Sequence, residues 1–448
     1  MNKRISGFSK LNKARKIKWI VKTFFKDPEN VMNELMSYWH SNEEEQKIFD
    51  GFSENTISNF MLPYGVAPNF MINNKVYAVP MVIEESSVVA AASSAAKFWA
   101  DRGGFKAEIL GTRKIGQLHF KWSGNALKLR SRLDEIKEFL MLEVNDITKN
   151  MDKRGGGVRD IELIDYTAKL DGYYQLRVSF ETCDSMGANF INSVLEQFGQ
   201  SLQQFVINDS GFIGTEKDLE IIMAILSNFT PQCMVRVTAE CPIKDLGNFP
   251  GGMDDSAFAH KFYEAVQIAH IDSYRATTHN KGIFNGIDAV VLATGNDFRA
   301  IEACGHTFAA KDGQYTSLSH CRVEDGTFKF WMDLPLAVGT VGGLTSLHPI
   351  AKRSLELLGN PCAEELMMII AATGLAQNFA AVRSLVTTGI QQGHMKMHLM
   401  NIINSLNATA EEEKKLVAHF ENEAVSFSAV RNTLDEIRTA SNSNNKAN

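Results

Sequence analysis

The sequence contains few cysteines, and this scarcity excludes two kinds of scaffold. Only six occur in 448 residues, and no two of them form a Cys-x-x-Cys pair. Zinc ribbons use such pairs, and small secreted domains use closely spaced cysteines for disulfides, so we expect neither a structural metal nor a disulfide framework. Scattered thiols in a chain of this length are typical of the reducing cytoplasm, which is the predicted location.

Long apolar runs and an excess of positive charge are also missing. The most apolar stretch, residues 363–382, is interrupted by Glu364, Glu365 and Gln377, so no membrane span is predicted. The basic N-terminus keeps charges inside its apolar patch, unlike a signal peptide. The formal net charge of −6 argues against a protein that coats the phosphate backbone of nucleic acid.

What is present indicates a globular α+β chain of two or three domains. Hydrophobic residues make up 44% and charged residues 22%, which are ordinary globular values. Strand and helix patterns alternate over residues 106–219 as in a ferredoxin-like domain, which we expect to be inserted into a larger, mainly helical domain formed by residues 1–105 and 220–388. The polar tail, residues 441–448, is predicted to be disordered.

Two segments place ionisable groups beside glycine or small residues in apolar surroundings. Glu84 and Glu85 lie between a β-rich run and a helix of small residues. Successive side chains there point in opposite directions, so one carboxyl can face a buried pocket; alternatively, both are solvated acids at a helix start. The second segment, residues 274–299, combines many polar groups with Gly282, Gly286 and Gly295, which indicates close approach of backbone or ligand. The alternative is a capped surface helix with salt bridges.

Two further segments are weaker signals. Asp184 follows a predicted strand and is a candidate N-cap, with Gly187 allowing a phosphate to approach the free N–H groups; a simple capped helix is the alternative. His394 and His398 would share one helix face, but the His-Glu-x-x-His pattern of a zinc site is absent. His394 can instead donate a proton.

Together these segments resemble the soluble bacterial (class II) 3-hydroxy-3-methylglutaryl-coenzyme A (HMG-CoA) reductases. The resemblance runs from about Glu54 to Asn404 and includes VPMVIEESSVVAAAS, RGGGVRDIE, DSMGANFIN, PLAVGTVGGLTSLHP and GIQQGHMKMH. The first 50 residues match poorly. The family implies reduction of a thioester to mevalonate and free coenzyme A by two hydrides from a nicotinamide cofactor. It also implies a homodimer with active sites at the subunit interface, and a mobile helical flap over residues 389–440.

The resemblance assigns roles to individual residues. Glu85, Lys281, Asp297 and His394 match the catalytic positions. Lys281 would stabilise negative charge on the thioester oxygen, His394 would protonate the leaving thiolate, and burial would keep Glu85 protonated as a proton donor. Asp297 would tune Lys281 and Glu85 in one coupled network. Ser87, Arg275 and Asn285 match substrate-binding positions. The cofactor positions are Thr148, Asp184, Met186, Gly187, Ala188, Asn189, Asn192, Gly342 and Gly343.

The resemblance leaves the cofactor and the direction of reaction open. Thr148 replaces an aspartate that binds the ribose 2′-hydroxyl in the NADH pattern, and Lys149, Lys153 and Arg154 lie close by, which favours NADPH over NADH. Two alternatives are the same enzyme oxidising mevalonate and a non-catalytic protein that binds coenzyme A thioesters. The presence of all four ionisable groups favours catalysis.

Overall fold

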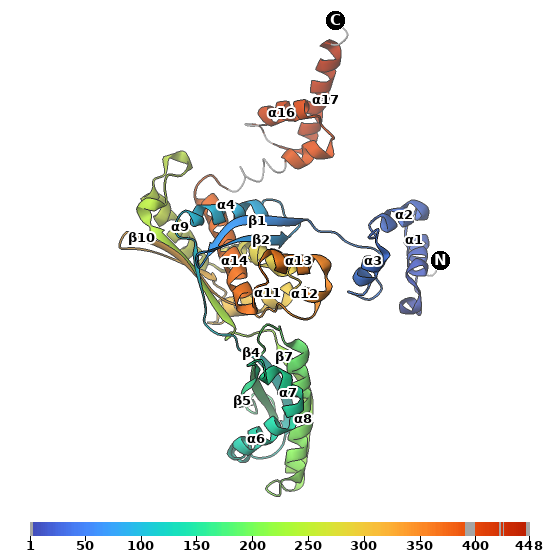
Figure 1. The fold of residues 1–448 in the computed structure, drawn as a ribbon, viewed down its shortest axis with the longest axis vertical. Coiled ribbons are helices and arrows are strands. Elements are labelled where there is room, and N and C mark those ends of the chain that lie inside the picture. The colour runs from blue at the N-terminus through green and yellow to red at the C-terminus, as the bar shows by residue number, and fades with distance from the viewer. Residues whose placement is uncertain (1–2, 390–398, 421–422, 424, 445–448) are drawn as a thin grey trace.

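Two separate β-sheets organise the chain (Figure 1). The computed structural model describes residues 3–389, 399–420, 423 and 425–444. It has the mixed α+β composition that the sequence predicts. The two sheets contribute to separate hydrophobic clusters, and the C-terminal helices form a third.

The larger sheet has six strands in the order β2-β1-β3-β8-β10-β9. Its strands pair antiparallel, except that β1 and β3 are parallel. Alternating burial along β8 and β10 is the pattern of a sheet with one face packed on the core. The strands are β1 (Tyr64–Ile72), β2 (Lys75–Val82), β3 (Phe105–Ile109), β8 (Met234–Pro242), β9 (Ser319–Glu324) and β10 (Thr327–Pro335).

Helices cover the six-stranded sheet. At their centre lies α14 (Ala363–Val386), which packs against α10 (Ser273–Ala293), α4 (Val88–Ala100) and α9 (Asp255–Ile271). By length and composition α14 could cross a membrane, but 83% of its most apolar window is buried inside the protein, as in the core helix of a globular domain. Shorter helices are α11 (Phe298–Ala309), α12 (Leu344–Leu347) and α13 (Pro349–Leu357).

The smaller sheet has four antiparallel strands in the order β5-β6-β4-β7. Its elements follow the β-α-β-β-α-β order of ferredoxin-like folds. The apolar faces of β4 and β6 pack against α8 and α6. The strands are β4 (Lys114–Trp122), β5 (Gly157–Asp165), β6 (Tyr173–Glu181) and β7 (Leu219–Ser227), and the helices are α5 (Ala126–Ser131), α6 (Leu133–Glu143), α7 (Asn145–Asp152) and α8 (Ala188–Asn208).

The limits predicted for the inserted domain, residues 106 and 219, do not coincide with the ends of the segment that forms the four-stranded sheet. Strand β3 lies before β4 but pairs with β8 of the larger sheet, with Phe105 opposite Ala239. Strand β7 begins at Leu219 and pairs with β4. Sequence alternation identifies a strand but not its partner, which explains the shift of both limits.

Two helical units project from the body in Figure 1. The N-terminal unit contains α1 (Lys13–Phe24), α2 (Pro28–Ser37) and α3 (Glu43–Asp50), and the C-terminal unit contains α16 (Ala410–His419) and α17 (Phe427–Asn444). Short 3-10 turns at Phe8–Lys10, Gly214–Lys217, Ile243–Asp245 and Pro250–Gly252 complete the regular structure. Thr409 and Glu412 form a capping box at the start of α16.

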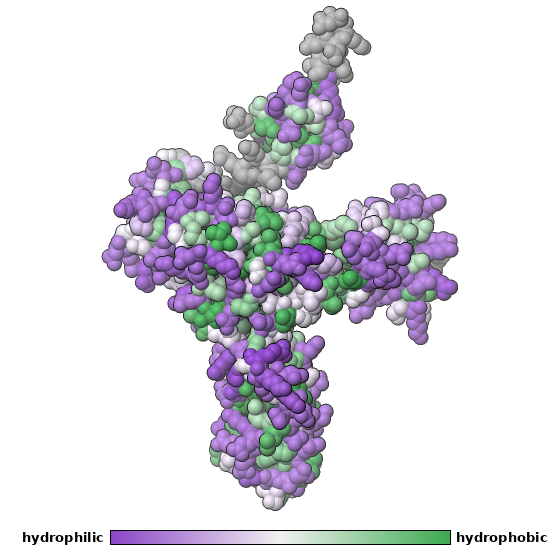
Figure 2. All heavy atoms as spheres, in the orientation of Figure 1, coloured by the Kyte–Doolittle hydropathy of each residue, from purple (hydrophilic) through white to green (hydrophobic). Residues whose placement is uncertain are grey.

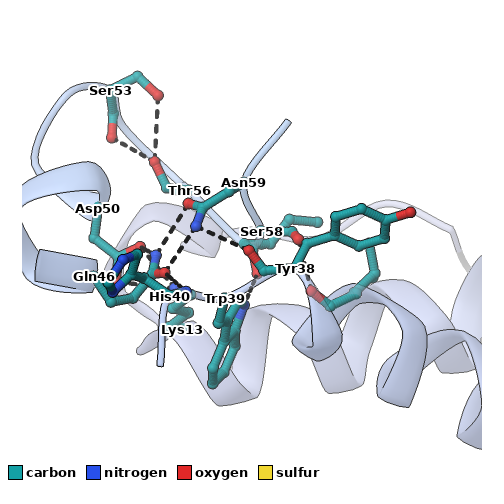
Figure 3. Close-up of polar contacts among 12 residues, drawn as sticks. Lys13, Tyr38, Trp39, His40, Gln46, Asp50, Ser53, Thr56, Ser58 and Asn59 are labelled. Carbon is teal, nitrogen blue, oxygen red and sulfur yellow. Dashed lines mark hydrogen bonds and ion pairs between the residues drawn. The ribbon is translucent and has the colours of Figure 1, made fainter. Parts of the chain in front are cut away.

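Polar contacts hold the N-terminal unit together (Figure 3). The Lys13 ammonium donates to Asp50 at 2.7 Å and lies 4.2 Å from the centre of the Trp39 ring. Gln46 donates to Asp50 and to Asn59, so α1, α3 and the following loop are joined through one cluster. The Trp39 indole donates to the carbonyl of Ile57. These contacts connect helices that are too short to be stable alone.

Candidate functional site

The predicted catalytic residues Glu85 and Lys281 form an ion pair. The Lys281 Nζ lies 2.6 Å from Glu85 Oε2, and the Asn285 amide donates to the same oxygen at 3.3 Å. Glu85 lies in the turn between β2 and α4, whereas Lys281 and Asn285 are one turn apart on α10. Three sequence-predicted site residues therefore meet at one carboxylate oxygen, although 196 residues separate the two charged partners.

This ion pair is open to solvent. The Lys281 side chain is 58% exposed and the Glu85 side chain 37% exposed. Within this single chain Glu85 is therefore not buried, and a cation holds its carboxylate. An exposed pair of this kind stabilises the fold little, so the two charges are available to a ligand.

The turn that carries Glu85 also contains a strained residue. Ser87 has a φ of 76°, which a non-glycine residue adopts at a cost, and it precedes α4 without capping it by its side chain. Strain of this kind is common at ligand-binding positions. Within the described residues, the Ser87 hydroxyl has no hydrogen-bond partner, so it is free to bind a ligand.

Arg275, predicted to bind a substrate carboxylate, lies half-buried on α10. Burial lowers the pKa of its guanidinium. No carboxylate within the described part of the chain forms an ion pair with it. A half-buried guanidinium without a counter-ion favours the binding of an anion, because a carboxylate fits its planar fork.

Glycine lets α10 approach α14 closely. A Cβ atom at Gly286 would lie 2.8 Å from the Thr373 carbonyl oxygen, whereas one at Gly282 would meet nothing within 4 Å. Gly295 has a φ of 71° and lies against Leu344. Close approach of backbone is thus confirmed at Gly286 and Gly295, whereas Gly282 faces open space, so that close approach of a ligand remains the prediction there.

Asp297 is joined to a different cation from Glu85. Its carboxylate accepts from the Arg299 guanidinium at 3.0 and 3.1 Å and caps the N-terminus of α11. Partial burial raises the pKa of Asp297, but the bonds from Arg299 and the Ala300 N–H outweigh this and hold the pKa below its usual range. Within the described residues, no ion pair or hydrogen bond joins Asp297 to Lys281 or Glu85, so the predicted three-residue network is not formed here.

A cavity of about 890 Å³ lies beside Asp297. Its walls come from the start of α8, the start of α11, one face of α7 and the glycine-rich loop before α12, so both sheet units contribute. A volume in this range is typical of cofactor pockets. The lining residues include the predicted Met186, Gly187, Ala188, Asn189, Gly342 and Gly343, together with Asn150, Arg154 and Arg299.

Glycines shape the walls of this cavity. Gly187, Gly342 and Gly343 have φ values of 88°, 81° and 59°, a region that favours glycine. A Cβ atom at Gly339 would lie 2.5 Å from the Met186 backbone nitrogen. The loop and the start of α8 therefore touch through backbone atoms and leave N–H groups near a helix N-terminus, where phosphate binds.

A buried lysine supports the turn before α8. Lys114 Nζ donates to the Ser185 carbonyl at 2.7 Å and to the Thr182 hydroxyl at 2.5 Å. Burial lowers the pKa of this ammonium. The sequence did not single out Lys114, because nothing in its neighbourhood distinguishes it from any other strand lysine.

Asp184 differs from its predicted role as the N-cap of α8. Gly187 occupies that position. The Asp184 carboxylate instead accepts from the Ala363 N–H at 2.7 Å, at the start of α14, and its carbonyl accepts from Thr340 and Val341. Asp184 therefore joins the turn before α8 to the core helix α14. It does not line the 890 Å³ cavity.

Two other predicted cofactor residues also lie off the cavity. The Thr148 side chain is buried, with 3% of the residue exposed, whereas Ile147, Asn150 and Met151 form the cavity-facing side of α7. The Asn192 side chain accepts from the Leu226 N–H at 2.9 Å and holds β7 against α8. Arg154, predicted only as a nearby cation, lines the cavity from the turn after α7.

His394 lies outside the described residues. Within the described ranges, no three histidine, cysteine, aspartate or glutamate side chains gather as potential metal ligands. The sequence predicts many polar groups in residues 274–299, which include Arg299, but it does not predict that Arg299 pairs with Asp297.

Comparison with known proteins identifies the family. A profile described as hydroxymethylglutaryl-coenzyme A reductase matches residues 15–399. An HMG-CoA reductase of Archaeoglobus fulgidus is 35% identical over 418 residues, which are 93% of this chain and 90% of that protein. A probable HMG-CoA reductase of Borreliella burgdorferi is 34% identical over 446 residues, 98% of this chain and 96% of that protein. Both matches extend into the first 50 residues, which therefore belong to the family more fully than the sequence motifs indicated.

Solved structures agree. The class II HMG-CoA reductase of Streptococcus pneumoniae bound to NADPH in open conformations has a TM-score of 0.67 and 35% identity, covering 92% of this chain and 99% of that one. A second structure of the reductase from this organism has a TM-score of 0.68 and 34% identity, covering 97% and 100%. The chain belongs to the class II HMG-CoA reductase family.

Proposed function

We propose that this chain reduces HMG-CoA with two equivalents of NADPH and two protons to mevalonate, free coenzyme A and two NADP⁺. The observation that carries the proposal is the Lys281 ammonium, 2.6 Å from Glu85 and one helical turn from Asn285. An ammonium paired with a carboxylate that an amide also holds is placed to stabilise an oxyanion, because little reorganisation is needed when charge develops.

Glu85 and Lys281 act together on the reacting carbonyl. Lys281 stabilises negative charge on the thioester oxygen as the hemithioacetal forms. Its collapse breaks the C–S bond, and His394 gives a proton to the leaving thiolate. In the second reduction Glu85 protonates the aldehyde oxygen. Asp297 joins this group by exchanging Arg299 for Lys281 as the site closes.

The substrate carboxylate binds to Arg275 and Ser87. Arg275 is half-buried and has no counter-ion among the described residues, and Ser87 offers a free hydroxyl on a strained turn. A charge-assisted bond to a guanidinium is about twice as strong as a neutral hydrogen bond. Asn285, which donates to Glu85, orients the catalytic carboxyl next to the substrate.

NADPH binds in the 890 Å³ cavity and supplies hydride. The glycine walls and the N-terminus of α8 fit the pyrophosphate, since backbone N–H groups and the helix dipole favour anions. The S. pneumoniae reductase that resembles this chain was solved with NADPH. Arg154 lines the cavity and binds the 2′-phosphate, whereas the buried Thr148 does not.

The active form is a homodimer with its sites at the subunit interface. The chain exposes apolar side chains where it leaves the N-terminal unit, including Phe60 at 92% and Met61 at 61%. Figure 2 shows further apolar side chains on the visible face of the body. Exposed apolar surface of this kind marks interfaces. Contact with a second subunit covers it and closes the solvent-exposed ion pair. The flap over residues 389–440 brings His394 to the thiolate.

The enzyme works in the cytoplasm.

The test is a spectrophotometric assay at 340 nm with HMG-CoA and each reduced nicotinamide in turn. We expect two nicotinamides oxidised per thioester consumed and a lower KM for NADPH than for NADH. The variant Arg154→Met should raise the KM for NADPH more than that for NADH. No thioester-dependent oxidation with either nicotinamide would contradict the reductase proposal, and oxidation of mevalonate as the sole activity would favour the reverse direction.

A further inference from the structure

The open face of the four-stranded sheet carries a second cavity. It has a volume of about 370 Å³ and shares no lining residue with the cofactor cavity. Helices α8 and α6 pack on the opposite face of the sheet, as Figure 1 shows. The lining residues are Arg113, Ile115, Gln117, Asp160, Glu162, Arg177, Ser179, Ser227, Phe229, Pro231 and Gln232.

Strand register brings these side chains into two rows. Ser179 on β6 lies opposite Ile115 on β4 and Asp160 on β5, and Ile115 lies opposite Ser227 on β7. In the next row, Arg177 lies opposite both Gln117 and Glu162. Alternate residues of a strand share one face, so both rows point away from α8.

A buried hydroxyl in this cavity lacks a hydrogen-bond partner. Ser179 is 9% exposed, and its Oγ is buried without a partner among the described residues. A buried polar atom without a partner is costly. Ser179 lines the cavity, so a ligand there can supply the missing bond.

Charges of both signs face the cavity without pairing. Glu162 and Arg177 occupy opposite positions on neighbouring strands, where opposite charges pair readily. Nevertheless, no ion pair within the described ranges involves Glu162, Arg177 or Arg113, whereas Asp160 pairs with the Lys137 ammonium at 3.4 Å and accepts from the Ile161 N–H at 2.8 Å. Because both guanidiniums and a carboxylate are left for a ligand, a molecule with one cationic and one anionic group complements them better than a simple anion does.

Apolar side chains and the connecting segments complete the cavity. Ile115, Phe229 and Pro231 form its apolar part. Arg113 precedes β4, and Phe229, Pro231 and Gln232 follow β7, so these residues lie in the two segments that join the four-stranded sheet to the six-stranded sheet. A ligand bound here touches both the small sheet and its connections to the body.

We propose that this cavity binds a free α-amino acid with an apolar side chain. Its carboxylate would bind Arg177 and Arg113, its ammonium would bind Glu162, Ser179 would take a polar atom of the same head group, and the side chain would pack on Ile115 and Phe229. The proposal goes beyond the reductase activity and does not depend on it.

Isothermal titration calorimetry on the full-length protein, without thioester or nicotinamide, tests the proposal with L-leucine as the probe. We expect saturable binding of L-leucine. N-acetyl-L-leucine, which lacks the ammonium, and L-leucinamide, which lacks the carboxylate, should each bind at least about tenfold more weakly, because each loses a charge-assisted bond. No saturable binding of L-leucine, or binding of either blocked compound as tight as that of L-leucine, would overturn the proposal.

Variants identify the site. Arg177→Gln and Glu162→Gln should each weaken L-leucine binding about tenfold or more, and Ser179→Ala by a smaller factor, since it removes a neutral bond. Lys121→Gln is the matched control, because Lys121 is an exposed β4 lysine outside the cavity, and it should leave affinity unchanged. Unchanged affinity in Arg177→Gln, or displacement of L-leucine by inorganic phosphate alone, would contradict an amino-acid site. Circular dichroism confirms that each variant is folded.

Discussion

The two predicted catalytic carboxylates, Asp297 and Glu85, differ in how far along the chain their cationic partners lie. Asp297 binds Arg299, two residues away, in a contact that the start of α11 creates locally. Glu85 binds Lys281, 196 residues away, in a contact that exists only because β2, α4 and α10 pack together. The local pair can form whenever α11 forms, whereas the distant pair reports on the assembled tertiary structure. We propose that the Glu85–Lys281 pair serves the reaction and that Arg299 is a replaceable partner of Asp297.

Removing the cation from each pair should give the largest contrast. Lys281→Ala should lower kcat by about 10²–10³-fold, because it removes the group that stabilises the oxyanion. Arg299→Ala should lower kcat by less than about tenfold, because Arg299 pairs with Asp297 and does not stabilise the charge that develops in the transition state. The assay at 340 nm measures both variants, with Lys261→Ala on an exposed face of α9 as the control. Equal losses in the two variants would remove the distinction between the pairs.

The helix that carries Lys281 offers a second contrast, between two of its glycines. Gly286→Ala should lower the free energy of unfolding by about 1–3 kcal/mol, because the new methyl group overlaps the Thr373 carbonyl. Gly282→Ala should raise it by about 0.4–1 kcal/mol, because its site is open and alanine favours a helix. Urea unfolding measures both values. Destabilisation by both substitutions to the same extent would show that the close approach of α10 to α14 is not the cause.

Lys114 tests how the turn before α8, next to the cavity beside Asp297, is held in place. Lys114→Met removes both bonds to the turn before α8 and leaves the Ser185 carbonyl without this donor. We expect the KM for NADPH to rise about tenfold with a smaller change in kcat, because the turn positions the cofactor and takes no part in the reaction. Lys114→Arg keeps a cation and should restore part of the affinity. A fall in kcat at unchanged KM would contradict a positioning role.

The smallest expected effect is on acid stability. The pKa of Asp297 is held below its usual range, so the folded protein binds its proton less tightly than the unfolded chain does. The stabilisation is therefore present above the unfolded pKa, near 4, and is lost as the pH falls through the folded pKa. Arg299→Gln should reduce the melting temperature by no more than about 1 °C at pH 6 and by less at pH 3. A larger decrease at pH 3 than at pH 6 would contradict this assignment.

Prediction from sequence worked best where motifs carry side chains that chemistry requires. Glu85, Lys281 and Asn285 were named from the sequence and meet in the structure. It worked less well where the orientation of a helix decides the outcome. Thr148 was named from its place in a motif, but the rotation of α7 buries it, and Arg154 in the turn after α7 lines the cavity instead. Asp184 was expected to cap the nearest helix, but its carboxylate accepts from the Ala363 N–H at the start of the distant α14 instead.

By itself, the sequence determined the family and the mixed α and β composition, and it named Glu85, Lys281 and Asn285, which meet in the structure. These properties follow from residue type and spacing, which are local. Only the tertiary structure decided which cation each carboxylate binds, which face of α7 meets the cofactor cavity, and that unpaired charges gather on the open sheet face. The reason is that hydrogen bonds and ion pairs act over a few ångströms, so their partners are set by packing between segments that the sequence places far apart.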